Sequence, residues 1–431
     1  MAFVEWQNHR GTNLEVNYRN KYKRLRKLAK AKIEHRQEEY WDETCEDIEK
    51  FIKINDPANA FSIIRRLKGG NKRVENMPIQ DKNGKLLVNS TDQLERWREY
   101  FCELFNIHST VGSDVINEIQ ITTPSRPGLE RQNAQPSIEE VERALNQMKS
   151  RKSPGSDEVT ADIIKAGSEP VLNWLHEIFN GVWENEKMVK EWSSATLVRL
   201  YKNKDDKKLR DNYRGVSLLN VTGKIFSRII LNRIQNLVDE QLLEIQSGFR
   251  ASKSTMDQIF TLKMIMQRTR EFNKPLFMCF IVITNAYDSV HREMLWKICQ
   301  NYGISEKLVN LLRMLYKDSK AKVKINGELS DSFEIKTGVM QGGIPSPMLF
   351  NILFDFVIRK VIEEANIAGV KFSYGSNDFF HGCREKYEKF NVLALLYADD
   401  LVAMCATTDD LEKFIRSFEK NHTKIWLNDK R

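Results

Sequence analysis

The sequence is poor in cysteine, and the cysteines it has are not paired. Six cysteines occur among 431 residues, at positions 45, 102, 279, 299, 383 and 405. None forms a C-x-x-C pair, and no paired histidines lie nearby, so the spacing indicates neither a zinc site nor a disulfide framework. Reduced thiols are typical of an intracellular protein, which leaves the cytoplasm and the nucleus open.

Long apolar runs and repeats are also missing. The first residues lack the apolar segment of a signal peptide, and the longest apolar stretch, residues 276–283, has only the length of a strand. No repeat of fixed period appears. The sequence therefore predicts neither a membrane span nor a repeat protein.

The overall composition is that of a globular protein. Hydrophobic residues make up 41%, aromatic residues 10% and charged residues 29% of the chain, which excludes a collagen, a coiled-coil rod and a fully disordered chain. Its length predicts two or three lobes. The 67 basic and 59 acidic residues leave a net charge of +8, which permits a polyanionic partner without establishing one.

Residues 1–106 are predicted to form a helical, basic N-terminal region with a small hairpin. Apolar spacing predicts helices over 14–70, and the first half of this stretch is basic enough to contact phosphates, through Arg24, Lys27 and Lys30 among others. A solvated helix face explains the same charges. Asn83-Gly84 predicts a type I′ hairpin turn, and a helix capped by Thr91 follows it.

Residues 107–136, rich in glycine, proline and polar residues, are predicted to be a flexible linker. Beyond it, Ser137 and Glu140 form a capping-box pattern that begins a helix. From there to residue 431, helices alternate with short apolar strands. This pattern predicts an α+β domain with an antiparallel sheet under helices.

Two segments carry residues suited to chemistry. In residues 391–404, two apolar strands flank Tyr397-Ala398-Asp399-Asp400, which predicts a hairpin with two carboxylates at its tip. Aspartate is common in any turn, yet acids delivered by a sheet also suit divalent metals and a triphosphate. In residues 336–358, a glycine-rich loop precedes a helix with Ser346 as N-cap and Pro347 at the first position. Such a loop can hold a base or a phosphate, or can be an ordinary junction.

Several motifs occur together in one order over residues 138–430. They are K-S-P-G-S-D at 152–157, N-Y-R-G-V-S-L-L at 212–219, Q-S-G-F-R at 246–250 followed by Ser254-Thr255, Q-G-x-x-x-S-P from Gln341, and Y-A-D-D at 397–400. In this combination the sequence resembles the reverse transcriptases of non-LTR (LINE-type) retrotransposons, closest to the RTE-like branch. The resemblance implies a right-hand polymerase fold with fingers and palm, and RNA-directed DNA synthesis from dNTPs on an RNA template with a DNA primer.

The resemblance also implies roles for single residues. Asp399 and Asp400 match the palm acids that bind Mg²⁺, and Gln341 with Gly342 matches the segment that lines the templating base and incoming nucleotide. Further matches are Lys202 and Arg214 at the triphosphate, Tyr287 at the position that excludes a ribose 2′-hydroxyl, and Arg250 among the nucleic-acid contacts.

One departure from the family pattern concerns the metal site. The family carries a metal-binding aspartate on the neighbouring palm strand, and alignment on A-Y-D-S-V places Val282 there. Two metal ions need carboxylates from more than one strand. Asp288 is not expected to substitute, because the chain by then has turned into a helix with Asp288 or Ser289 as N-cap. The sequence therefore predicts an impaired active site.

The ends of the sequence complete the expectations. The chain starts at the helical linker and stops soon after the palm acids, at Arg431. The resemblance then predicts that an upstream endonuclease and the thumb are absent from this chain. The alternative is a non-catalytic RNA-binding relic or co-opted protein that keeps the basic helix and the fingers groove.

Overall fold

The structure is a computed structural model that describes residues 2–54, 56–67, 78–107, 116–117, 119, 128–374 and 388–425. The chain divides into two compact units, Met1–Glu75 and Asn76–Arg431. Each unit is described by itself.

The first unit consists of helices, as its sequence predicts. Helix α1 (Ala2–Asn8) packs against the start of α2 (Glu15–Lys53), and α3 (Pro57–Leu67) follows. The indole of Trp6 stacks on the Tyr22 ring with centroids 5.6 Å apart. At 1.5 Å per residue, α2 is about 58 Å long. Thr44 is its one described buried residue, so most of the surface of α2 is exposed, including apolar side chains such as Leu28 and Ile33.

The second unit contains a five-stranded sheet in the order β4-β3-β6-β7, with β8 also paired to β6. Its strands are β3 (Ser194–Tyr201), β4 (Tyr213–Leu218), β6 (Lys320–Ile325), β7 (Glu328–Leu329) and β8 (Phe333–Glu334). Helix α4 (Ser90–Leu104) covers one face, where Trp97 and Phe101 are completely buried against Leu197 and Val323. The helix and the sheet therefore share one hydrophobic core.

The division after Glu75 lies upstream of the linker expected at 107–136. The hairpin β1 (Ile79–Gln80) and β2 (Leu86–Leu87) and helix α4 belong to the second unit, because their apolar side chains pack on the sheet. Most of 107–136 lies outside the described residues. The hairpin turn is not type I′, because Gly84 has a positive φ and Asn83 does not. The N-cap of α4 is Asn89 rather than Thr91. The side chain of Asn89 accepts a hydrogen bond from the N–H of Thr91.

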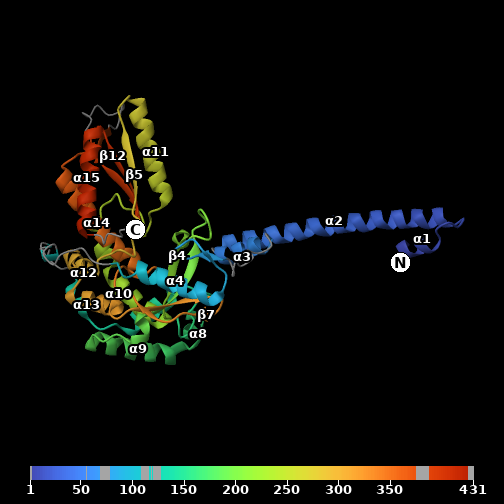
Figure 1. The fold of residues 1–431 in the computed structure, drawn as a ribbon, viewed down its shortest axis with the longest axis horizontal. Helices are drawn as coiled ribbons and strands as arrows, with labels where there is room; N and C mark the ends of the chain where they lie inside the picture. The colour runs from blue at the N-terminus through green and yellow to red at the C-terminus, as the bar shows by residue number, and fades with distance from the viewer. Residues whose placement is uncertain are drawn as a thin grey trace, which may run out of the picture. The chain divides into compact units, whose positions relative to one another are not determined.

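A second, three-stranded sheet in the order β11-β12-β5 is fully antiparallel. Its strands are β11 (Ala394–Tyr397), β12 (Asp400–Cys405) and β5 (Phe277–Val282). Helix α11 (Thr255–Glu271) packs on one face, and α14 (Ser346–Ala365) with α15 (Thr408–Ile425) packs on the other (Figure 1). The hairpin β9 (Val370–Tyr374) and β10 (Glu388–Val392) joins the α11 side. The predicted α+β architecture is confirmed.

The remaining helices form the main hydrophobic core together with α14. Ser137 and Glu140 make the predicted capping box, and Glu140 also binds Arg233, whose side chain is 2% exposed.

Among the residues placed by the structure, no helix is both long and apolar enough to cross a membrane. The helices are α6 (Leu129–Asn133), α7 (Ile138–Asn146), α8 (Ala161–Ala166), α9 (Ser168–Asn185), α10 (Val221–Asp239), α12 (Arg292–Asn301) and α13 (Glu306–Tyr316), with short 3-10 turns at Lys190–Ser193 and Arg210–Asn212.

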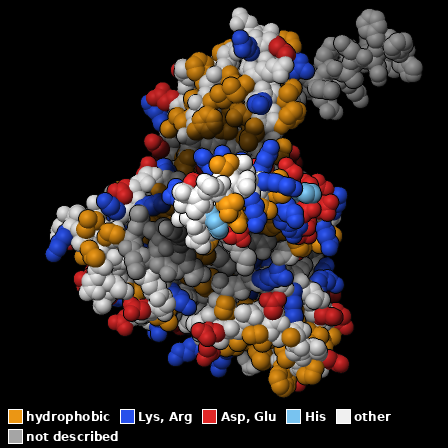
Figure 2. Space-filling model, turned by 90° about the vertical axis from the view of Figure 1, so that its right-hand side faces the viewer, with side chains coloured by type: hydrophobic (Ala, Val, Ile, Leu, Met, Phe, Trp, Pro, Cys, Tyr) orange, Lys and Arg blue, Asp and Glu red, His pale blue; other side chains and the backbone are white. Residues whose placement is uncertain are grey.

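One face of the second unit exposes apolar side chains. Figure 2 shows hydrophobic side chains gathered on the lobe formed by α11 and the three-stranded sheet. Phe260 on α11 is 65% exposed, and Phe280 and Val282 on β5 are 68% and 69% exposed. The end of β5 that carries Val282 is therefore open to solvent.

Candidate active site

The two adjacent carboxylates lie in a tight hairpin turn, as the sequence predicts. Tyr397 pairs with Asp400 across β11 and β12, which leaves Ala398 and Asp399 as the two turn residues. Ala398 has a φ of +55°, in the left-handed region that non-glycine residues seldom adopt. The turn therefore presents Asp399 and Asp400 at one end of the three-stranded sheet.

Val282 lies directly opposite Asp400 in the antiparallel pairing of β5 and β12. Directly opposed residues of such a pair project to the same face with Cβ atoms roughly 5 Å apart. The side chain nearest to Asp400 on the neighbouring strand is thus an apolar valine. A carboxylate at this position would lie beside the Asp400 carboxylate.

The two acids of the turn lie close together, and nearby positive charge only partly neutralises them. The pKa of Asp400 is raised above its ordinary value, first by burial and then by the negative charge of Asp399. The guanidinium of Arg214 on β4 opposes this rise. Arg214 is therefore close enough to the acid turn to act on its charge.

The residues present do not fit a two-metal centre. Such a centre needs bridging carboxylates from more than one strand, whereas Asp399 and Asp400 come from a single turn and the residue opposite Asp400 is Val282. Within the described ranges, no three histidine, cysteine, aspartate or glutamate side chains come together in a metal-binding group.

The loop of Gln341 and Gly342 is joined to strand β4. The backbone N–H of Ser217 donates to the carbonyl of Gln341 at 2.7 Å. Gly342 has a φ of +111°, and a Cβ there would stand 2.5 Å from the Ser217 oxygen. Only glycine fits this approach, so the glycine-rich loop packs on the five-stranded sheet as its composition suggests. Helix α14 begins at Ser346 with Pro345 as N-cap, one residue earlier than expected.

Asp288 has a different place from the one expected. The N-cap of α12 is His291, whose Nδ1 accepts from the N–H of Met294. Asp288 is buried, and the Gln341 amide donates to both of its carboxylate oxygens at 3.2 Å. Burial raises the pKa of Asp288 to about 7, against the lowering effects of Gln341 and the Lys202 cation. Asp288 thus fixes the side chain of Gln341.

Tyr287 lies between the acid turn and helix α14. Its ring stacks on Phe350 with centroids 4.6 Å apart. Its hydroxyl is buried and has no hydrogen-bond partner in the described part of the chain. Burial and the Asp399 charge both raise the pKa of Tyr287. An unpaired buried hydroxyl can accept a partner from a bound molecule.

Lys202 and Val282 line one cleft of about 850 Å³. The cleft also takes in residues 283–285 and the end of α15, and its volume is in the range of small-molecule sites. Burial and the nearby Arg214 lower the pKa of Lys202, whose ammonium donates to the Asp211 carbonyl at 2.7 Å. The lining residues include neither Arg214, Gln341 and Gly342 nor the acids Asp399 and Asp400. The cleft adjoins the acid turn through Val282, which pairs with Asp400.

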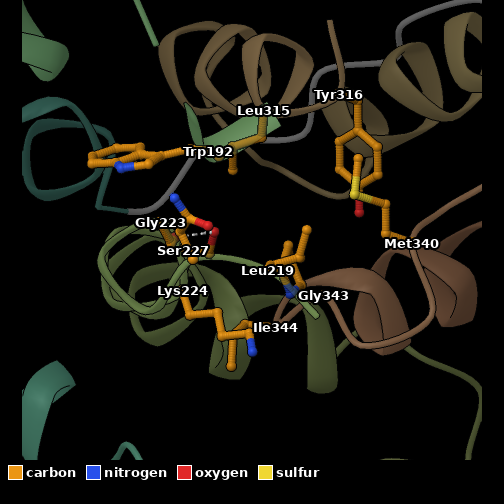
Figure 3. Close-up of a pocket in the computed structure, with 12 residues that line it drawn as sticks. Trp192, Leu219, Gly223, Lys224, Ser227, Leu315, Tyr316, Met340, Gly343 and Ile344 are labelled. Atoms are coloured by element: carbon orange, nitrogen blue, oxygen red, sulfur yellow. Dashed lines mark hydrogen bonds between the residues drawn. The ribbon is translucent and has the colours of Figure 1, made fainter. Parts of the chain in front are cut away.

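A second cavity lies beside the glycine-rich loop, but it is too small for a nucleotide. Figure 3 shows Gly343 and Ile344 close to Leu219, which precedes α10, and to Lys224 in its first turn. Its volume of about 30 Å³ is enough for one water molecule. Burial lowers the pKa of Lys224. We therefore place the candidate site at the larger cleft and the acid turn.

The side chain of Arg250, which the resemblance places among the nucleic-acid contacts, makes several bonds within the protein. Its side chain is 7% exposed and pairs with Asp239 at 2.7 Å. The guanidinium also donates to the carbonyls of Leu243, Gln246 and Asp239. These bonds use all three guanidinium nitrogens, so Arg250 also ties the backbone of residues 239–246 together.

The structure adds two residues to the site that sequence reasoning left without a role. The side chain of Gln246 bonds to both the N–H and the carbonyl of Ala398 in the acid turn. Gly248 lies against the same residue, with no room for a Cβ. Both residues belong to the Q-S-G-F-R motif, so the motif marked this segment as important. Only the fold shows that the segment contacts the acid turn.

The basic residues Arg24, Lys27 and Lys30 lie in the first unit, exposed on α2. Lys30 has an exposed partner in Glu34 at 3.6 Å. The structure gives no relation between these residues and the acid turn.

Comparison with known proteins decides the family. A family model described as reverse transcriptase (RNA-dependent DNA polymerase) matches residues 202–428, from Lys202 to beyond the acid turn. The chain belongs to the reverse transcriptase family. This reverse transcriptase chain has relatives among the polymerases of non-LTR retrotransposons, which agrees with the LINE-type resemblance of its motifs.

Three relatives illustrate the match. The probable RNA-directed DNA polymerase from transposon BS of Drosophila melanogaster is 24% identical over 64% of this chain and 31% of its own length. The RNA-directed DNA polymerase from mobile element jockey of the same fly is 25% identical over 66% and 30%. A transposon TX1 protein of 149 kDa from Xenopus laevis is 24% identical over 82% and 26%. The chain spans less than a third of the length of these relatives.

Proposed function

We propose that this chain is by descent an RNA-directed DNA polymerase core whose metal site is incomplete because Val282 occupies the position of an acid. Its substrates would be dNTPs, its partners an RNA template and a DNA primer, and its cofactor Mg²⁺. The observation that carries the proposal is the register of β5 and β12, in which Val282 faces Asp400.

The surrounding residues support nucleotide binding in the same place. Lys202 lies in the cleft with Val282, and Arg214 is close enough to offset the charge of Asp400. Cations there would neutralise the charge of a triphosphate. The unpaired hydroxyl of Tyr287, near Asp399, could meet the sugar of an incoming nucleotide. Gln341, fixed by Asp288, would line the site of the base.

Magnesium, when bound, would supply charge neutralisation at the phosphates. In this chain Asp399 and Asp400 could contribute ligands, but the second strand contributes none. Without bound metal ions, Arg214 is the only residue in the described part of the chain that offsets the negative charge of Asp400. Burial and the Asp399 charge accordingly raise the pKa of Asp400. We therefore expect little or no polymerisation by the unaltered chain.

Primer extension on an RNA template with Mg²⁺ tests the proposal. We expect no extension by the unaltered chain, extension by Val282→Asp, and loss of it in Val282→Asp combined with Asp399→Ala. Phe280→Asp is the matched control, because Phe280 is equally exposed on the same face of β5 but faces Val402 rather than Asp400. An acid there adds the same charge outside the metal site.

Two outcomes would contradict the proposal. Extension by the unaltered chain that is lost in Asp399→Ala would mean that another group completes the metal site. A folded Val282→Asp variant that neither extends a primer nor binds Mn²⁺ more tightly than the Phe280→Asp control would mean that Val282 is not what limits the site.

A second candidate function is RNA binding without catalysis, favoured by the exposed basic face of α2. Arg24, Arg26 and Lys27 are exposed, and no ion pair is found for them among the described residues. Changing these three to glutamine should reduce the log–log salt slope of single-stranded RNA binding by about 2, at about 0.7 per phosphate contact.

Three other cations of the first unit give the matched control for RNA binding. Lys21, Arg36 and Lys53 each pair with a glutamate, so their change to glutamine should alter the slope less. Equal effects of the two triple variants, or a flat salt dependence of the unaltered chain, would remove this candidate.

A further inference from the structure

We infer that the segment Gln246–Arg250, whose first three residues are buried, sets the geometry of the acid turn, with Gln246 as its positioning residue. The segment is about 150 residues away from the turn in the sequence, and nothing in its own chemistry marks it as part of an active site. Its effect on catalysis rests on the proposed function, whereas its effect on the turn does not.

The side chain of Gln246 binds both polar backbone groups of one residue. Its Oε1 accepts from the N–H of Ala398 at 3.0 Å, and its Nε2 donates to the Ala398 carbonyl at 3.3 Å. Gln246 is 3% exposed, so water does not compete for these bonds. Among the side chains of this size, only an amide offers a donor and an acceptor together.

The residue that Gln246 holds is the strained one. Ala398 has a φ of +55°, and the left-handed region costs a non-glycine residue roughly 1–2 kcal/mol. Two hydrogen bonds to the same residue offset a cost of this size. Since Asp399 follows directly, the backbone angles of Ala398 decide where the two carboxylates point.

The rest of the segment secures Gln246 against the turn. The N–H of Ser247 donates to the Leu396 carbonyl at 3.0 Å, and the N–H of Leu396 donates to the Ile245 carbonyl at 2.9 Å. The segment thereby continues the sheet beside β11 as a parallel bridge. Arg250 donates to the carbonyl of Gln246 at 3.1 Å, so the ion pair of Arg250 also anchors this backbone.

Gly248 permits the close approach. A Cβ at Gly248 would stand 2.2 Å from the nitrogen of Ala398 and 2.8 Å from its Cα. Asn351 on α14 donates to the Gly248 carbonyl at 2.8 Å. The turn is therefore held by backbone and buried amides on the side away from solvent, and its two acids remain free on the other.

Hydrogen exchange followed by mass spectrometry tests the inference without requiring catalysis. In Gln246→Leu, we expect amides of the peptide 394–405 to exchange at least tenfold faster, while peptides from α9 and α13 stay unchanged. Gln246→Glu is a milder variant that keeps the acceptor for Ala398 but places an anion at its carbonyl. It should give a smaller change of the same kind.

Gln132 provides a matched control. It is also 3% exposed, and its amide likewise donates to one backbone carbonyl, of Gly303, and accepts from one N–H, of Ser305. Gln132→Leu should accelerate exchange around 128–133 and 303–308 and leave 394–405 unchanged. If Gln132→Leu affects 394–405 as much as Gln246→Leu does, Gln246 is a general packing residue and the inference is overturned.

A second readout uses the Val282→Asp background. If that variant extends primers, adding Gln246→Glu should lower kcat at least tenfold with little change in the KM for dNTP, because the acids move while the nucleotide contacts remain. A folded Val282→Asp variant that neither extends a primer nor binds Mn²⁺ more tightly than Phe280→Asp would contradict the proposed function but not this inference. Unchanged exchange of 394–405 in both Gln246 variants would overturn the inference whatever the activity.

Discussion

The buried carboxyl of Asp288 makes a strong prediction about how stability depends on pH. Burial raises the pKa of Asp288 from 3.8 to about 7. Between these values the folded chain keeps a proton that the unfolded chain releases, so the free energy of unfolding falls as pH rises through this window. Asn at this position cannot ionise, and its oxygen can still accept from Gln341.

The magnitude follows from the shift. About 3 pKa units at 1.36 kcal/mol each give a total of about 4 kcal/mol, fully expressed above pH 7. Roughly 2–3 kcal/mol of this falls between pH 5 and pH 8. We therefore expect Asp288→Asn to gain about that much stability relative to the unaltered chain over this interval, as measured by urea unfolding at each pH.

Comparison across pH removes any constant effect of the substitution itself. Asp162→Asn is the control, because backbone N–H donation from Arg151 lowers the pKa of Asp162, and it stays ionised from pH 5 to pH 8. Its difference from the unaltered chain should not change with pH. A constant difference for Asp288→Asn as well would refute the argument that this carboxyl is protonated in the folded chain near neutrality.

Three further predictions concern stability and are read from urea unfolding midpoints. Arg233→Met should cost about 3–5 kcal/mol, because the nearly buried guanidinium pairs with Glu140 and its loss leaves a half-buried carboxylate; a loss below 1 kcal/mol would show that the pair is dispensable. Gly155→Ala should cost about 1–3 kcal/mol, because its Cβ would meet the Asn220 side-chain oxygen at 2.3 Å; an unchanged midpoint would mean that the contact relaxes freely. Trp97→Ala should cost about 3–5 kcal/mol by opening a cavity under α4, and hydrogen exchange should then rise in α4 first.

Local patterns in the sequence predicted local structure well. The apolar strands around Asp399 specify the hairpin, and Ser137 with Glu140 specifies the start of a helix, because both depend on neighbours within a few residues. Alignment on A-Y-D-S-V also placed Val282 on a strand, and the structure puts this strand next to the acid turn. The family match itself followed from the order of the motifs.

Apart from the exact N-caps and the type of one hairpin turn, the roles misjudged were those of residues whose partners lie outside the local pattern. Arg250 reads as a free cation in the sequence, yet it meets Asp239 across a loop. Asp288 reads as a helix cap, yet the Gln341 amide lies 53 residues away. The placement of α4 depends on Trp97 and Phe101 finding the sheet, which no local periodicity reveals. Tertiary packing, not propensity, decides each of these roles.

The position of β5 at the edge of its sheet has a consequence for the behaviour of the protein in solution. In the described part of the chain, β5 pairs only with β12, and Phe280 and Val282 are exposed on one face of this edge strand. An open apolar edge invites strand pairing between molecules, and natural proteins often place a charge there to prevent it. An aspartate at position 282 would serve as such a charge, so the change that completes the metal site should also make the chain less prone to aggregate.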